Sequence, residues 1–183
     1  MGDEQKIIEE IISGQTRSYR ILVERYQNPV FRVILKIVGN SEDARELTQD
    51  VFVKAYESIR QYKPEYKFFS WIYRIAINNA MLFVKRRKKR IKTEKMLQNS
   101  FQIADQNDDH DNRDYLLNRS LHELSGNYQS VILLKYYAGL SYADMAESLG
   151  IPEKKVKSRL FDARIMLKEK LSESRFFSAI EDN

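Results

Sequence analysis

A stripe of aromatic, amide and cationic residues gives the sequence its clearest binding chemistry. Trp71, Arg74, Asn78 and Lys85 fall within about 60° of one another on a predicted helix. Aromatic rings stack on unpaired bases, an amide can pair with a base edge, and cations neutralise phosphates. The stripe therefore indicates a nucleic-acid contact. The alternative is a buried Trp, an Asn satisfied inside the core, and a solvated basic helix end.

The elements around this stripe would position it. The loop before the helix is aromatic and contains Pro64, and Ser70 is predicted to be the helix N-cap. The opposite face of the helix is apolar and is predicted to enter the core. That face consists of Ile72, Ala76, Ala80 and Phe83. The helix ends in a run of cations made of Lys85, Arg86, Arg87, Lys88, Lys89, Arg90 and Lys92.

Composition favours a binding protein over an enzyme. The 183 residues include 31 Lys and Arg against 26 Asp and Glu, and the predicted pI is about 9.2. The basic excess is concentrated after residue 84, which favours a polyanionic partner. The chain has no Cys, which excludes disulfides, a thiolate nucleophile and a zinc–thiolate site.

The remaining residue types offer little for catalysis. Of the two histidines, His110 lies in an acidic run and His122 on a predicted helix, and neither has metal-ligand spacing. The glycines form no phosphate-binding loop. We therefore expect no catalytic residues, no cofactor and no metal. We find no signal peptide and no membrane span, so a cytoplasmic protein without membrane insertion is expected.

Helical periodicity dominates the whole chain, and no convincing strand pattern occurs. The first half is predicted to form helices over residues 4–12, 16–26, 30–38, 41–59 and 71–85, with breaks at Gly14, Asn28-Pro29 and Gly39-Asn40. The second half is predicted to form helices over residues 115–123, 127–137, 142–149 and 153–172.

A polar segment over residues 99–114 divides these halves, because it is rich in Asp, Asn and Gln and poor in large apolar residues. We therefore predict an all-α protein of two small helical domains, residues 1–95 and 115–183, joined by a flexible linker at 96–114.

The helix over residues 41–59 has a polar outer face. Ala44, Leu47, Val51 and Ala55 are spaced to be buried, and the opposite side is acidic and amidic. That side consists of Glu42, Glu46, Gln49 and Asp50. Residue types alone leave two interpretations open, an ordinary solvated face or a docking face for a basic partner.

Residues 138–171 contain a helix-turn-helix pattern. Ser141 and Asp144 can form a capping box, Gly150 permits the turn, and Pro152 suits the first position of the next helix. An apolar face made of Val156, Leu160, Ala163, Leu167 and Leu171 buries that second helix. Its outward side consists of Lys154, Lys155, Ser158, Arg159 and Asp162, flanked by Lys157 and Phe161. This pattern predicts a recognition helix for the major groove; the alternative is a helical hairpin with a basic surface.

The chain as a whole resembles a bacterial RNA polymerase sigma factor of the extracytoplasmic-function (ECF) class, the short type that has only regions 2 and 4. The segment ARELTQDVFVKAYESI (44–59) resembles region 2.2, and FFSWIYRIAINNAMLFVKRRKKR (68–90) resembles regions 2.3–2.4. The segment LSYADMAESLGIPEKKVKSRLFDARIMLKEKL (140–171) resembles region 4.2.

The resemblance implies a transcription initiation factor, not itself an enzyme, that binds core RNA polymerase and directs it to promoter DNA. It implies contacts to the β′ clamp helices by Glu46, Gln49 and Asp50, and a further contact to the β flap. For reading and opening the −10 element it implies Tyr62, Tyr66, Phe68, Phe69, Trp71, Arg74, Asn78, Lys85, Arg86, Arg87 and Lys88. For reading the −35 element it implies Lys154, Lys155, Lys157, Ser158, Arg159 and Phe161. An anti-sigma factor or another regulatory partner is also implied.

Three positions depart from the family pattern. Leu82 stands where many relatives have Asp, Lys154-Lys155 replaces a common Gly-Thr pair, and Asp162 replaces a basic or neutral residue. Two other functions are alternatives: a free-standing dimeric helix-turn-helix regulator, and an RNA-processing enzyme with carboxylate-bound metal. The first leaves residues 68–90 unexplained, and the second lacks carboxylates at ligand spacing.

Overall fold

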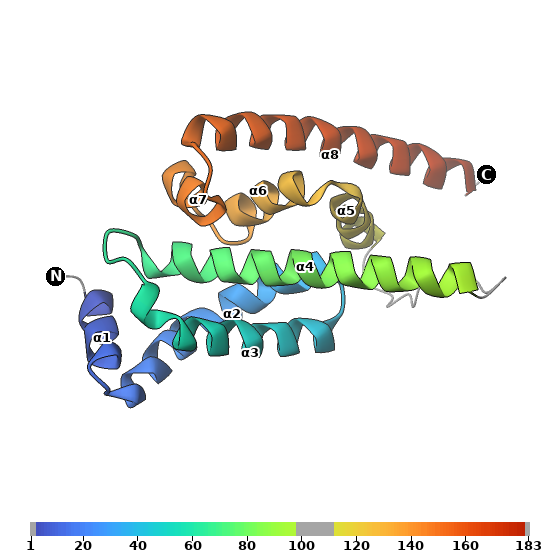
Figure 1. The fold of residues 1–183 in the computed structure, drawn as a ribbon. Coiled ribbons are helices and arrows are strands. Elements are labelled where there is room, and N and C mark those ends of the chain that lie inside the picture. Colours follow the sequence, from blue (N-terminus) through green and yellow to red (C-terminus); the bar gives the residue numbers. More distant parts are fainter. Residues whose placement is uncertain (1–2, 98–111, 182–183) are drawn as a thin grey trace.

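The fold is all-α, as predicted. The computed structural model describes residues 3–97 and 112–181, which contain helices and no strands. Helices α2, α3 and α4 form the centre of the first body, and helices α5 to α8 form the second (Figure 1). Within the described ranges no helix is long and apolar enough to span a bilayer.

The first body is a helical bundle with a short helix at its N-terminal end. Its elements are α1 (Asp3–Ile12), α2 (Tyr19–Val38), α3 (Ser41–Glu57) and α4 (Phe68–Leu97), with 3₁₀ turns at Thr16–Ser18 and Ile59–Gln61. Residues Ala44, Leu47, Val51 and Ala55 of α3 are buried, which confirms the predicted core line.

Sharp breaks fix the angle between α2 and α3. Gly39 ends α2 with φ +75°, a left-handed conformation that costs glycine nothing sterically. The Asn40 side chain then accepts hydrogen bonds from the N–H groups of Glu42 and Asp43, at 2.8 and 3.0 Å, and caps α3. This cap lies one residue before the predicted helix start.

Pro29 does not break the chain as predicted, because α2 runs through it as one helix. A proline inside a helix loses one backbone hydrogen bond and costs about 3 kcal/mol. Leu22, Val30, Val33 and Ile34 have no exposed surface, so their burial on both sides of Pro29 offsets that cost. The prediction of two separate helices was therefore wrong.

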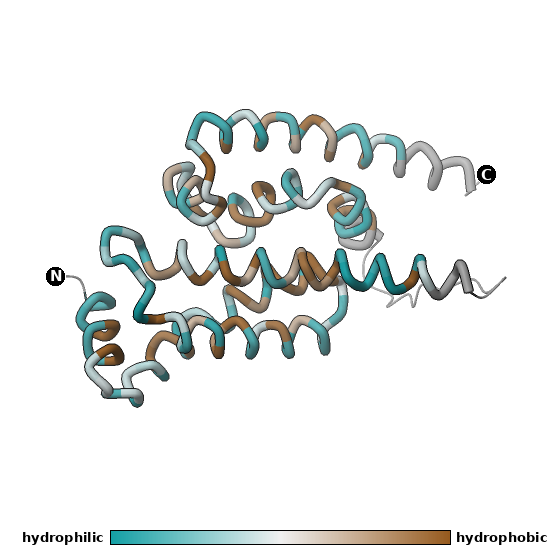
Figure 2. The backbone as a smooth tube through the Cα atoms, in the orientation of Figure 1, coloured by the Kyte–Doolittle hydropathy of each residue, from teal (hydrophilic) through white to brown (hydrophobic). Residues whose placement is uncertain are grey.

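Helix α4 starts earlier than predicted. The N–H groups of Ser70 and Trp71 donate to the Lys67 carbonyl, so Lys67 occupies the cap position and Ser70 is fully buried inside the first turn. Ser70 is therefore not the N-cap. At its other end the helix continues through the whole basic run, and Figure 2 shows its change from hydrophobic to hydrophilic along its length.

The second body consists of α5 (Asn112–Glu123), α6 (Gly126–Tyr136), α7 (Tyr142–Leu149) and α8 (Glu153–Glu181). The Ser141 hydroxyl accepts from the Asp144 N–H at 3.1 Å and donates to the Asp144 carboxylate at 2.6 Å. Gly150 follows α7 with φ +63° and makes the turn into α8. The predicted helix-turn-helix geometry is present.

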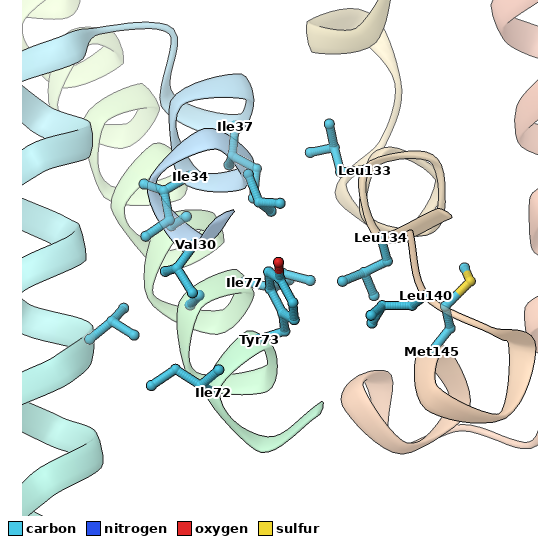
Figure 3. Packing of buried hydrophobic residues seen from close by; sticks show 14 of the residues in the cluster. Val30, Ile34, Ile37, Ile72, Tyr73, Ile77, Leu133, Leu134, Leu140 and Met145 are labelled. Carbon is cyan, nitrogen blue, oxygen red and sulfur yellow. The ribbon is translucent and has the colours of Figure 1, made fainter. Parts of the chain in front are cut away.

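The two bodies pack directly against each other. Tyr73 and Ile77 of α4 lie between Val30 of α2 and the side chains of Leu134 and Leu140 in the second body (Figure 3). One continuous apolar core therefore passes through both bodies, an arrangement that the predicted flexible linker did not suggest. Most of the predicted linker, residues 98–111, lies outside the described residues.

Candidate nucleic-acid interface

The predicted stripe on α4 lines a cleft between the two bodies. Arg74, Asn78 and Lys85 contribute to the wall of a cavity of about 830 Å³, together with Lys88 and, from α8, Arg159. Among the described residues, no Asp or Glu lines it. The cleft is therefore a positively charged surface with amide hydrogen-bonding groups, which suits a phosphate backbone with a base alongside.

Trp71 does not belong to this wall. Its ring lies 5.6 Å from Tyr62 and 5.7 Å from Phe68, centroid to centroid, in tilted or edge-on contacts. Phe68 is fully buried and Tyr62 is 9% exposed. Phe68 is therefore a core residue in this structure, where it supports the loop and has no exposed ring surface for a base, although the resemblance implies a DNA contact.

The loop before α4 is held by its own aromatic residues. The Tyr62 hydroxyl donates to the Tyr66 carbonyl, and burial raises the pKa of Tyr62 to about 12. Tyr66 is 44% exposed, and the half-buried Phe69 ring lies beneath the Lys67 ammonium group at 5.3 Å. Tyr66 and Phe69 are thus the loop rings with surface available for stacking.

The basic run projects from the end of α4. Lys85, Arg86, Arg87 and Lys88 are exposed, and Arg87 forms an ion pair with Asp43 of α3 at 3.3 Å. An exposed pair of this kind is worth about 0–1 kcal/mol, so a phosphate can replace Asp43 at little cost.

The start of α8 presents the predicted recognition residues. Lys154, Lys155 and Ser158 are exposed, and the Phe161 ring is 63% exposed. Lys157 is already engaged, since its ammonium group lies 2.6 Å from Glu153 and 5.3 Å from the Tyr142 ring. Val156, Leu160 and Ala163 are buried and fix the orientation of the helix.

The predicted polymerase-docking face of α3 is free of intrachain cover. Glu46, Gln49 and Asp50 are exposed. Sequence reasoning missed two apolar residues that continue this side of the helix, Val53 at 56% exposure and Tyr56 at 38%. Val53 follows Gln49 and Asp50 by four and three residues, and Tyr56 follows Val53 by three, so this helical spacing was the available signal.

Sequence reasoning also missed the contacts that cover the start of α4. Arg74 donates from Nε to the Ser148 carbonyl at 3.3 Å, and from Nη2 to the Glu147 carbonyl. The Lys67 ammonium group lies 2.9 Å from the Asp144 carboxylate. No signal in the sequence could reveal these contacts, because they depend on how the two bodies dock.

The electrostatics of this contact follow from burial and charge. Burial opposes ionisation of Asp144, but hydrogen bonds from Ser141 and Lys67 outweigh it and lower the pKa of that carboxyl. Hydrogen bonding to Asp144 raises the pKa of Lys67. Burial raises the pKa of Glu147, which has Ser70, Lys67 and Arg74 as its neighbours.

Comparison with known proteins places both bodies in one family. The family model of Sigma-70 region 2 matches residues 22–90, and the family model of Sigma-70 region 4 matches residues 115–167. The chain is 30% identical to the ECF RNA polymerase sigma-E factor of Haemophilus influenzae, over 92% of this chain and 95% of that protein. It is 26% identical to the ECF RNA polymerase sigma factor SigW of Bacillus subtilis, over 91% and 96%.

Solved structures show the same fold. CnrH, in complex with the cytosolic domain of CnrY, matches with a TM-score of 0.69 and 23% identity, over 91% of this chain and 96% of that one. The sigma factor RpoE of Bartonella quintana, in complex with the anti-sigma factor NepR, matches with a TM-score of 0.67 and 22% identity, over 85% and 98%.

The chain therefore belongs to the ECF class of RNA polymerase sigma factors, which direct the polymerase to promoters. The free-standing regulator gains no support, because the region 2 match accounts for residues that such a regulator would lack. Among the described residues, no three Asp, Glu or His side chains come together as a metal site.

Proposed function

We propose that the first body captures an unpaired base and the adjoining strand of the −10 element. Arg74, Asn78 and Lys85 supply cationic and amide groups along one wall of α4, and Tyr66 with Phe69 supplies exposed ring surface at its N-terminal end. The observation that carries this proposal is the alignment of Arg74, Asn78 and Lys85 along α4, directly after the loop that carries Tyr66. Extruding a base costs a few kcal/mol, and stacking returns about 1–3 kcal/mol per base.

The second body would bind duplex DNA at the −35 element through the start of α8. Lys154 and Lys155 lie in its first turn, and Ser158 follows one turn later on the exposed side. This geometry suits a recognition helix that enters the major groove with its N-terminal end. Asp162, half-buried on the same helix, would repel phosphates or accept from a cytosine amino group.

Two surfaces would hold the polymerase. The acidic and apolar face of α3, formed by Glu46, Gln49, Asp50 and Val53, suits the β′ clamp helices. An apolar groove of about 690 Å³ on the second body suits a partner helix, and we assign it to the β flap. Residues lining that groove include Leu117, Leu121, Ile132, Tyr136 and Leu167.

This function requires no catalytic residue, because the polymerase carries out the chemistry and strand capture shifts the equilibrium towards open DNA. It places the protein in the cytoplasm with the polymerase. The solved relatives are in complex with CnrY and with the anti-sigma factor NepR, so we expect this chain also to have an anti-sigma partner.

Run-off transcription tests the proposal most directly. Purified chain is added to core polymerase on a genomic fragment library, with core polymerase alone as the control. We expect stoichiometric capture of the polymerase and transcripts that start at defined sites. A chain that neither binds the polymerase nor supports specific initiation, or that footprints a palindrome without polymerase, would contradict it.

A further inference from the structure

The cleft between the two bodies collects cations from both of them. Lys85 and Lys88 of α4 and Arg159 of α8 line its cavity of about 830 Å³. Among the described residues no carboxylate pairs with any of these three, whereas Arg87 of α4 pairs with Asp43 away from the cavity. Cations brought together without a counter-charge repel one another, and an anion bound between them would remove that repulsion.

The remaining electrostatics show which cations an external anion could use. Arg74, the fourth cation of the cavity wall, already donates to two carbonyls at the end of α7. Burial lowers the pKa of His122 on α5, and the charge of Lys88 lowers it further, so the field of α4 reaches the second body. Lys85, Lys88 and Arg159 therefore remain available to a ligand.

The rest of the cavity wall is apolar or carries amides. Met81, Val84 and Leu149 give half-buried apolar surface beside the cations. The amides of Asn78 and Asn127 line the same cavity, and each can donate and accept hydrogen bonds. Cavities of about 300–1,000 Å³ with apolar walls and a few polar groups are typical of small-molecule sites. Phosphates suit the cations of this cavity, and a base suits its apolar surface and amides.

We propose that this cleft binds a nucleotide with two or more linked phosphates, which lie between Lys85 and Lys88 on one side and Arg159 on the other. The base lies against the apolar wall at Met81 and Val84. Because such a ligand contacts both bodies, its binding adds to the stability of their packed arrangement. The promoter strand assigned to α4 needs Lys85 and Lys88 as well, so the nucleotide and the strand exclude each other. The inference goes beyond the proposed function by giving the chain a small-molecule ligand.

Calorimetric titration of the free full chain with ADP and with GDP tests the site. Pyrophosphate, which lacks the base, and the two nucleosides, which lack the phosphates, are the control ligands. We expect at least one diphosphate to bind about tenfold more tightly than pyrophosphate and than its own nucleoside. Absence of binding by both diphosphates, or equal binding of pyrophosphate, would overturn the inference.

Variants on the two bodies locate the ligand. Lys88→Ala and Arg159→Ala each remove one cation, and each should weaken diphosphate binding about tenfold or more through a lost charge-assisted contact. Lys89→Ala on α4 and Lys168→Ala on α8 are the matched controls, because neither residue lines the cavity. A loss in only one of the two cavity variants would show that the ligand does not lie between the bodies, and would overturn the inference.

Asn127→Asp separates this site from the DNA surfaces. Asn127 belongs to none of the proposed DNA or polymerase sites, and an acidic residue in the first turn of α6 is favourable for the helix. The new carboxylate should weaken diphosphate binding about tenfold by repulsion, while Asn28→Asp, at an exposed position of α2, should not. Both variants should bind a random single-stranded oligonucleotide as the parent does, with circular dichroism to verify folding. Equal losses of oligonucleotide and diphosphate binding in Asn127→Asp would identify a strand site instead, and would overturn the inference.

Run-off transcription with core polymerase keeps this inference apart from the proposed function. ADP and GDP are suitable here because RNA synthesis consumes triphosphates. Without a diphosphate, the parent and Asn127→Asp should initiate equally well; a saturating diphosphate added before the polymerase should reduce initiation by the parent alone. Unchanged initiation by the parent would overturn the competition with the strand. Absence of any transcription with the parent would instead contradict the proposed function, while the calorimetry would still decide whether the cleft binds a nucleotide.

Discussion

Lys67 and Asp144 stand 77 positions apart in the chain, yet their charged groups lie 2.9 Å apart. The pair joins the loop of region 2 to the first helix of the helix-turn-helix. Asp144 also takes a hydrogen bond from Ser141, so one carboxylate both caps α7 and holds the other body. The predictions that follow test the surfaces on either side of this contact.

Replacing Arg74 or Asn78 by Ala should impair promoter opening and leave polymerase binding intact. Each side chain faces the cleft and would hold the captured strand, and one lost contact of about 1.5–3 kcal/mol corresponds to roughly 10- to 100-fold. Permanganate reactivity of unpaired thymines measures opening, and gel filtration measures polymerase binding. Arg17→Ala, at an exposed position in the first 3₁₀ turn, is the control. Loss of both activities together would count against the assignment.

The double change Glu46→Lys and Asp50→Lys should weaken polymerase binding. Both carboxylates are exposed on α3, and reversing their charge replaces attraction to a basic partner by repulsion. We expect at least about a tenfold loss of affinity, greater at low salt. Fluorescence anisotropy with labelled chain gives the measurement. The double variant Glu9→Lys and Glu169→Lys makes the same charge change elsewhere, and an equal loss there would refute a specific contact.

Lys155→Ala should weaken binding to promoter duplex across all sequences. Lys155 is exposed in the first turn of α8, where a phosphate contact is expected. Loss of one such contact should reduce the slope of log affinity against log salt by about 1. A salt titration by anisotropy measures this slope. Lys168→Ala, three turns further along α8, should leave it unchanged. A loss confined to particular base pairs would identify Lys155 as a base reader instead.

Acidification should loosen the contact between the bodies through His122. Burial lowers the pKa of His122 below its usual value of 6.5, and the nearby charges of Lys88 and Lys36 lower it further. Because the packed arrangement of the two bodies disfavours the protonated ring, the stability of that arrangement is complete above pH 6.5 and falls as the pH drops towards the lowered pKa. The ring also packs against Gly39 of the first body.

Energy transfer between two dyes on cysteines introduced at the exposed residues Arg60 and Glu173, followed from pH 7.5 to 5.5, measures this effect. His122→Gln should remove the fall in transfer with acid. Protonation of Glu147, whose pKa is raised, acts in the opposite direction and favours the packed arrangement, so the difference between parent and variant isolates the histidine. Identical profiles for the two chains would exclude His122 as the cause.

Gly150→Ala should destabilise the second body. Gly150 has φ +63°, where a Cβ is strained by about 1–2 kcal/mol. The expected result is a lower midpoint in urea unfolding with an unchanged slope. Ser172→Ala, at an exposed position of α8, is the control. An unchanged midpoint would show that the turn relaxes without cost.

Local patterns predicted most of the helices and the exposed sides of α3 and α8. The core line of α3, the turn at Gly150 and the exposed start of α8 all follow from side-chain spacing within single elements. Prediction failed where burial offsets an unfavourable local residue. At Pro29, the free-energy cost of a proline inside a helix is offset by the buried apolar face of α2. The packing of Phe68 and Trp71 against Tyr62 of the preceding loop was also not predicted.

The docking of the two bodies could not be predicted at all. The sequence does not indicate that Lys67 and Arg74 meet Glu147 and its neighbours, because these residues lie on different helices far apart in the chain. Even Gly126 carries no signal by itself, since its small size matters only opposite Met81.

Helix α4 lies in the middle of the continuous core, and separating the bodies would therefore uncover the sides of Tyr73 and Ile77 that face the second body. Apolar surface that becomes exposed to solvent favours self-association or binding of another protein. Separation of the two bodies would therefore be least prone to aggregation on the polymerase, whose surface could cover the exposed apolar side chains.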